Sequence, residues 1–140
     1  MSESKIMVST QRQLAPKQRL LLILLPMLAT FVCLRLYLHL VRVRHIYPGG
    51  YLVHHLFVGV LIVIPAAFIL AIGARNRLLA LLAPAALGVG SAMVLDEVTY
   101  LVATKATNED YVSAVSLHGA IFLVSLAVIL LLVLYRFQRD

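Results

Sequence analysis

Two pairs of adjacent ionisable residues contain the groups in this sequence best suited to chemistry. Asp96 and Glu97 lie inside the otherwise apolar stretch 78–104, and His54 and His55 open another apolar stretch. Carboxylate and neutral imidazole groups bind divalent metals such as zinc or non-haem iron. Imidazole also exchanges protons near neutral pH. The residue types therefore predict a polar site for a metal or for a proton.

The elements that position these residues are apolar helices. Hydrophobic residues make up 62% of the 140 residues, and charged residues only 13%, which is far from the average soluble domain. Four runs, at 19–43, 51–73, 78–104 and 111–135, are long enough to cross a hydrocarbon core of about 30 Å. We predict an all-α, integral membrane four-helix bundle of antiparallel spans that follows a cytoplasmic polar tail at 1–18.

The charge distribution predicts how the chain lies in the membrane. The net charge is +6, but the basic residues form no single face, so we expect no nucleic-acid partner. By the positive-inside rule both termini are cytoplasmic. We expect a multi-pass protein of the cell membrane, and the short loops favour a bacterial cytoplasmic membrane. The basic residues expected inside are Lys5, Arg12, Lys17, Arg19, Arg75, Arg77, Arg136 and Arg139, against Arg42, Arg44 and Lys105 outside.

Depth in the membrane connects the polar residues of all four spans. An acid at a bilayer centre costs about 2.5 to 3.5 kcal/mol on insertion scales, so the acidic pair needs partners or water. With a rise of about 1.5 Å per residue, the candidate partners lie about 5 to 12 Å from the outer ends of the spans. This layer in the outer half of the bilayer contains Arg35, His39, His54, Asp96 and His118.

Helix geometry gives expectations for the neighbours of the acids. Adjacent helical residues point about 100° apart, so only one member of each pair needs to face the bundle axis. We expect Asp96 to be the inward acid, with Tyr100 on its face. Small residues such as Gly88 and Gly90 in the third span predict close approach of another helix. Four tyrosines near the outer boundary are expected to form an interfacial aromatic belt: Tyr47, Tyr51, Tyr100 and Tyr111.

The preferred interpretation is a metal-dependent enzyme. A bound divalent metal, zinc or iron, would activate water or oxygen against a lipid-like substrate that enters from the membrane. In this interpretation Glu97 is the general acid/base, and Arg35 holds an anionic group or a ligand carboxylate. The expected metal ligands are His54, His55, Asp96 and His118, with His39 as a further candidate.

Three other interpretations remain open. Arg35 could pair with an acid while the histidines form a proton relay, as in a proton-coupled transporter or a ligand-binding oligomer. The same groups could form a structural network that fixes helix register in a subunit or assembly factor of a membrane complex. Facing histidines such as His39 or His54 with His118 could also hold haem b.

Two short patterns resemble those of small four-span prokaryotic membrane proteins whose activity is uncharacterised. They are His54-His55-Leu56-Phe57-Val58-Gly59, and Gly88-x-Gly90 followed by Leu95-Asp96-Glu97. The resemblance covers only the second and third spans, about a third of the chain. It implies that the His-His and Asp-Glu pairs act as one unit, and it implies no particular activity.

Overall fold

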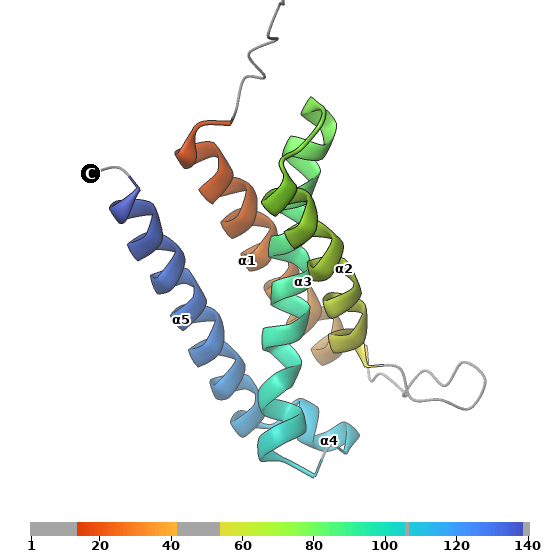
Figure 1. Ribbon diagram of the computed structural model, residues 1–140. Coiled ribbons are helices and arrows are strands. Elements are labelled where there is room, and N and C mark those ends of the chain that lie inside the picture. Colours follow the sequence, from red (N-terminus) through yellow and green to blue (C-terminus); the bar gives the residue numbers. More distant parts are fainter. Residues whose placement is uncertain (1–13, 42–53, 106, 139–140) are drawn as a thin grey trace, which may run out of the picture.

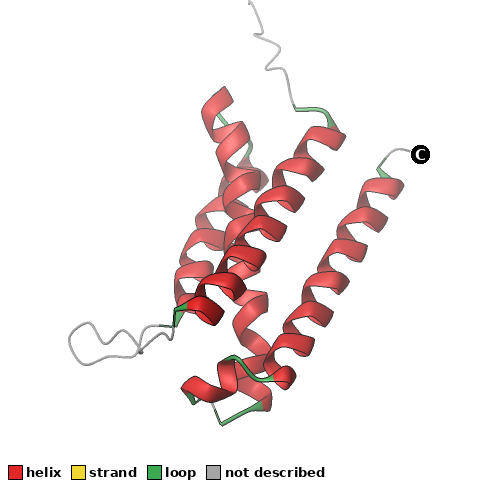
Figure 2. Ribbon diagram, turned by 180° about the vertical axis from the view of Figure 1, so that it is seen from behind, coloured by secondary structure: helices red, strands yellow, loops and turns green. Residues whose placement is uncertain are grey.

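The computed structural model is an all-α protein with four long helices and one short one (Figures 1 and 2). It describes residues 14–41, 54–105 and 107–138. The four long helices are long and apolar enough to cross a membrane. The predicted fold class is confirmed, and the chain is a small multi-pass membrane protein. The helices are α1 (Pro16–Leu40), α2 (His55–Ile72), α3 (Arg77–Ala103), α4 (Asn108–Tyr111) and α5 (Ala114–Phe137).

The last predicted span is not one continuous helix: the short helix α4 ends near the start of this span, and the long helix α5 then begins. The hydroxyl of Thr107 accepts a hydrogen bond from the Asp110 N–H at 3.2 Å, and the Asp110 carboxylate accepts one from the Thr107 N–H at 3.1 Å. This reciprocal pair caps the single turn of α4. The Ser113 hydroxyl then caps α5 by accepting from the Ser116 N–H at 3.3 Å. As a result Tyr111 lies outside the long helix.

Helix α3 is the centre of the bundle and packs against α1, α2 and α5. The close approach expected from its glycines is present. A Cβ added to Gly90 would lie 2.7 Å from the Gly59 carbonyl oxygen of α2, and a Cβ on Gly59 would lie 2.7 Å from the Gly90 carbonyl oxygen. A Cβ added to Gly88 would likewise clash with the backbone of α1 at Ile23. Glycine allows these backbones to touch because it has no side chain.

The ionisable residues lie at one end of this bundle. The last turns of α1 and α3 meet there with the first turns of α2 and α5 and with α4 (Figure 1). We call this the α4 end. Figure 1 shows that α1 starts and α5 finishes at the opposite end, which we call the terminal end. Many large apolar side chains of α1, α2 and α5 are exposed, as expected for helices in contact with lipid.

Candidate functional site: an ionic cluster at the α4 end

Asp96 is the most completely buried charged residue of the cluster, with an exposed fraction of 0%. Its Oδ1 accepts a hydrogen bond from Arg35 Nε at 2.5 Å. Its Oδ2 accepts one from the hydroxyl of Tyr111 and lies 3.2 Å from His55 Nε2. This single carboxylate therefore connects α3 to α1, α2 and α4.

Glu97 is 2% exposed and faces the beginning of α2. Its Oε1 pairs with His54 Nδ1. Its Oε2 lies 3.2 Å from His55 Nδ1 and accepts a hydrogen bond from the Leu56 N–H at 2.7 Å. His54, at the N-cap position of α2, makes no capping hydrogen bond with its side chain. The first turn of α2 is thus capped by a carboxylate from α3, where the positive end of the helix dipole also favours an anion.

Both acids are buried although they point about 100° apart on the helix. Asp96 meets α1 and α4, whereas Glu97 meets the start of α2. Asp96 is inward, as expected, and Tyr100 is buried near it. The sequence did not indicate that α3 is covered on more than one side. Because of this cover, both acids contact groups on other helices.

Arg35 connects α1 to three other helices. Besides Asp96 Oδ1, its guanidinium donates to the carbonyl oxygens of Asp96 and Tyr111, both at 3.1 Å, and of Ser116 at 3.3 Å. The Ser116 hydroxyl lies 3.3 and 3.4 Å from its two terminal nitrogens. The guanidinium also lies 4.8 Å from the centre of the Tyr111 ring. These contacts engage all five N–H donors of the side chain.

Two tyrosines expected in an interfacial belt belong to the cluster instead, so that prediction is wrong for both. Tyr100 is 1% exposed, and its ring centre lies 5.1 Å from that of Tyr111 and 6.2 Å from that of His54. Burial first, and then the negative charge of Asp96, raise the pKa of Tyr111. Its hydroxyl therefore keeps the proton that it donates to Asp96. Tyr47 and Tyr51 lie outside the described residues.

His55 contacts both acids with opposite sides of its ring. Nε2 lies 3.2 Å from Asp96 Oδ2, and Nδ1 lies 3.2 Å from Glu97 Oε2. A neutral imidazole carries one N–H donor, whereas the imidazolium carries two. The contact with Asp96 is a hydrogen bond and the contact with Glu97 is an ion-pair contact, so a protonated ring has its positive charge between the two carboxylates. In that form the positive charges of Arg35 and His55 balance the two negative charges of Asp96 and Glu97.

The structure brings together Arg35, His54, His55, Asp96 and Glu97, but not the other two histidines predicted for the site. His118 and His39 are exposed. Ser116 faces the cluster and is fully buried, and a residue two positions further along a helix points about 200° away. This rotation turns His118 away from the site. His39 lies one turn beyond Arg35, towards the end of α1.

The metal part of the prediction finds no support in this arrangement. Among the residues that the structure describes, no group of three or more His, Cys, Asp and Glu side chains could hold a metal ion. The physical reason is that both ring nitrogens of His55 and Nδ1 of His54 face carboxylate oxygens, and Asp96 is already engaged by Arg35 and Tyr111. The structure also does not bring His54 and His118 together as a facing pair for haem, because His118 is exposed and points away from the cluster.

The buried polar atoms of the cluster are paired with one another, and its two histidines are partly exposed. In the described part of the chain, every buried side-chain nitrogen and oxygen atom has a hydrogen-bond partner. The side chains of His54 and His55 are 14% and 20% exposed. These two rings are therefore more accessible than the carboxylates that they contact.

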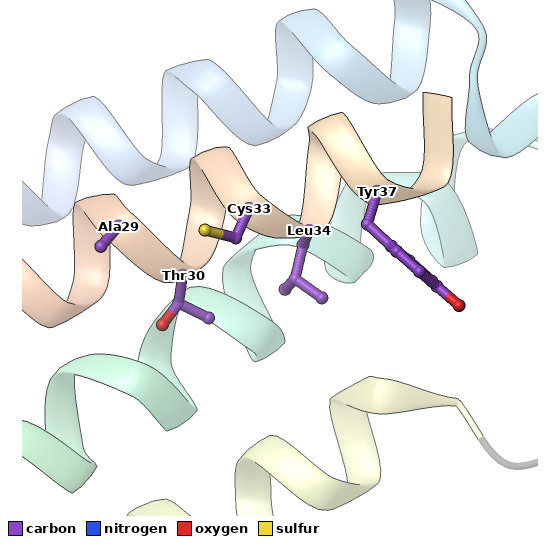
Figure 3. A pocket seen from close by; sticks show the side chains of 5 residues that line it. All are labelled: Ala29, Thr30, Cys33, Leu34 and Tyr37. Carbon is purple, nitrogen blue, oxygen red and sulfur yellow. The ribbon is translucent and has the colours of Figure 1, made fainter. Parts of the chain in front are cut away.

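Among the described residues, two open hollows lie beside α1. One, of about 460 Å³, is lined by residues of α1 (Figure 3): Ala29, Thr30, Cys33, Leu34 and Tyr37. The other, of about 300 Å³, lies between α1 and the α4–α5 segment, and its largely apolar walls include Arg35, His39 and Tyr111. Because the five donors of Arg35 are already engaged, this second hollow offers no free guanidinium N–H to a ligand.

Comparison with known proteins returns no match: no family model, curated protein or solved structure matches the chain. The geometry of the cluster is therefore the basis on which a function is proposed.

Proposed function

We propose that this is a proton-responsive membrane protein, in which a proton on His55 locks the α4 end of the bundle. The observation that carries the proposal is the position of the His55 ring. Its two nitrogens lie 3.2 Å from oxygens of two different buried carboxylates, Asp96 and Glu97. A protonated ring places its positive charge between these two carboxylates, and imidazole is the side chain suited to gain or lose a proton near neutral pH.

The balance of charge explains why the cluster responds to this proton. With His55 protonated, the two acids are matched by two cations. Loss of the proton leaves one negative charge without compensation among buried groups, which is strongly unfavourable. Among the described residues that surround His55, Arg35 is already paired with Asp96 and Tyr111 keeps its proton, so neither supplies a replacement cation.

The apolar part of the bundle favours a response over transport. Between the cluster and the terminal end, the spanning helices carry no Asp, Glu, His, Lys or Arg at residues 20–34, 56–72, 78–95 and 119–134. A proton relay across a membrane needs a chain of such groups. One copy of this protein therefore exchanges protons at the α4 end alone. The transporter interpretation is disfavoured because the helices provide no chain of ionisable groups across the membrane.

The test is to follow the protonation of each histidine by ¹⁵N NMR of the imidazole rings in nanodiscs. As the pH rises through about 5 to 9, we expect the His55 ring to change from two N–H groups to one. A neutral His55 with one fixed tautomer over the whole range would overturn the proposal. His118→Gln is the matched control and should leave the His55 signals unchanged.

The second candidate function is a purely structural one, and the complete pairing of the buried polar atoms favours it. In this case the cluster holds the helices in register in a subunit of a membrane complex, and no proton is exchanged during function. It predicts that stability in detergent is independent of pH across the histidine range, and that a stoichiometric partner co-purifies. The lipid-like substrate and the homo-oligomer expected from the sequence stay predictions.

A further inference from the structure

We infer that the proton on the cluster controls the first turn of α2, because the carboxylate that caps this helix is also the one that depends on His55. The inference rests on the proposed function and names the element that responds. Glu97 Oε2 accepts from the Leu56 N–H at 2.7 Å and lies 3.2 Å from His55 Nδ1. One oxygen atom thus serves both the helix end and the titrating ring.

The two acids are not equally affected when the proton leaves. A neutral His55 keeps one N–H, and its positive charge is lost from between the two carboxylates. Asp96 would still be neutralised by Arg35 at 2.5 Å and hydrogen-bonded by Tyr111. Glu97 has no contact with a guanidinium in the described structure, and its other partners are His54 and a backbone N–H. The uncompensated charge therefore falls on Glu97.

A charged Glu97 is stabilised by water, which is reached past the partly exposed histidines. Movement of the carboxylate in that direction breaks its hydrogen bond to Leu56. The first turn of α2 then has no side-chain cap, because His54 at the N-cap position provides none. The expected result is fraying of α2 at the α4 end.

The close packing of glycines limits how far this fraying extends. Gly59 is buried against the backbone of Gly90, about one turn after His55. The hydrogen bonds of Arg35 hold α1, α3, α4 and α5 together without any help from α2. The response is therefore confined to the turn between His55 and Gly59, while the rest of the α4 end stays in place.

Hydrogen–deuterium exchange of the protein in nanodiscs tests this inference, with rates corrected for the intrinsic effect of pH. When the pH rises above the histidine range, amides of residues 56–58 should exchange roughly fivefold faster, as expected for loss of a helix cap. Amides of residues 114–117 should keep their rates. Both measurements use the unmodified chain, so they do not depend on a variant that folds poorly.

Two variants sharpen the test. Glu97→Gln keeps an oxygen that accepts from the Leu56 N–H but carries no charge, so protection of residues 56–58 should become independent of pH. His118→Gln should behave like the unmodified chain. Titration of His55 by NMR without a change at residues 56–58 would overturn this inference alone. Absence of both the titration and the exchange response would overturn the proposed function as well.

Discussion

Asp96 and Glu97 are neighbours in the chain and share His55, yet their other partners give them different roles. Asp96 is held by the permanent charge of Arg35, while Glu97 is held by histidines and a backbone N–H. The Arg35–Asp96 pair is thus the constant part of the cluster, and we propose that the Glu97–histidine contacts are the part that responds to pH.

Removing one partner of the Arg35–Asp96 pair should lower the free energy of unfolding more than replacing both partners with apolar residues. Asp96→Asn leaves the part-buried guanidinium of Arg35 without its counter-charge, and breaking a buried pair in this way costs about 3 to 5 kcal/mol. The double variant Arg35→Met/Asp96→Leu removes both charges and should recover part of that loss. Unfolding by SDS, followed by circular dichroism, measures both. If Asp96→Asn is as stable as the unmodified chain, the pair does not hold the bundle together.

Tyr111 gives a second prediction, at alkaline pH. Because its folded-state pKa is raised by burial and by Asp96, its contribution to stability is complete below the ordinary tyrosine value of about 10 and is lost as the pH rises above it. Tyr111→Phe lacks this group. The difference in unfolding free energy between the two proteins should therefore become smaller above about pH 10, measured by SDS unfolding at a series of pH values. A constant difference would contradict the assignment.

At the scale of the helix, the sequence predicts depth well and rotation poorly. A fixed rise per residue was sufficient to place Arg35, His54 and Asp96 in one layer, and their own charges then bring them together. It was not sufficient for His118, because depth does not determine which way a side chain points. The sequence prediction of one continuous fourth span also gave no reason to expect a contact between Tyr111 and Asp96. Two capping residues six positions apart, Thr107 and Ser113, were the signal for a break in the helix.

The packing of α2 on α3 gives a prediction that is independent of the charges. Gly90→Ala places a Cβ 2.7 Å from the Gly59 carbonyl oxygen, so the two helices must separate. We expect a loss of about 1 to 3 kcal/mol, as for overpacked interiors. Ala67→Leu adds bulk at an exposed position of α2 and should have little effect. Thermal unfolding in detergent compares the two, and equal stability would show that the close contact is not needed.

In the whole molecule, the cluster lies at the end of the bundle opposite to the start of α1 and the end of α5 (Figure 1). The positive-inside rule predicts that those two helix ends face the cytoplasm. We therefore expect the cluster to respond to pH on the outer side of the membrane. The apolar stretch 78–95 of α3, about 27 Å long at the helical rise, separates the acids from the other side.

Reconstituted vesicles with a defined orientation allow this to be tested with one-sided pH changes. A cleavable tag on the C-terminus identifies vesicles in which the terminal end faces inward. In these, a rise in external pH should increase exchange at residues 56–58, and a rise in internal pH should not. The reverse dependence would place the α4 end in the cytoplasm and turn the protein into a sensor of internal pH. A response to both sides would require a proton path through the apolar part of the bundle, which this sequence does not provide in a single copy.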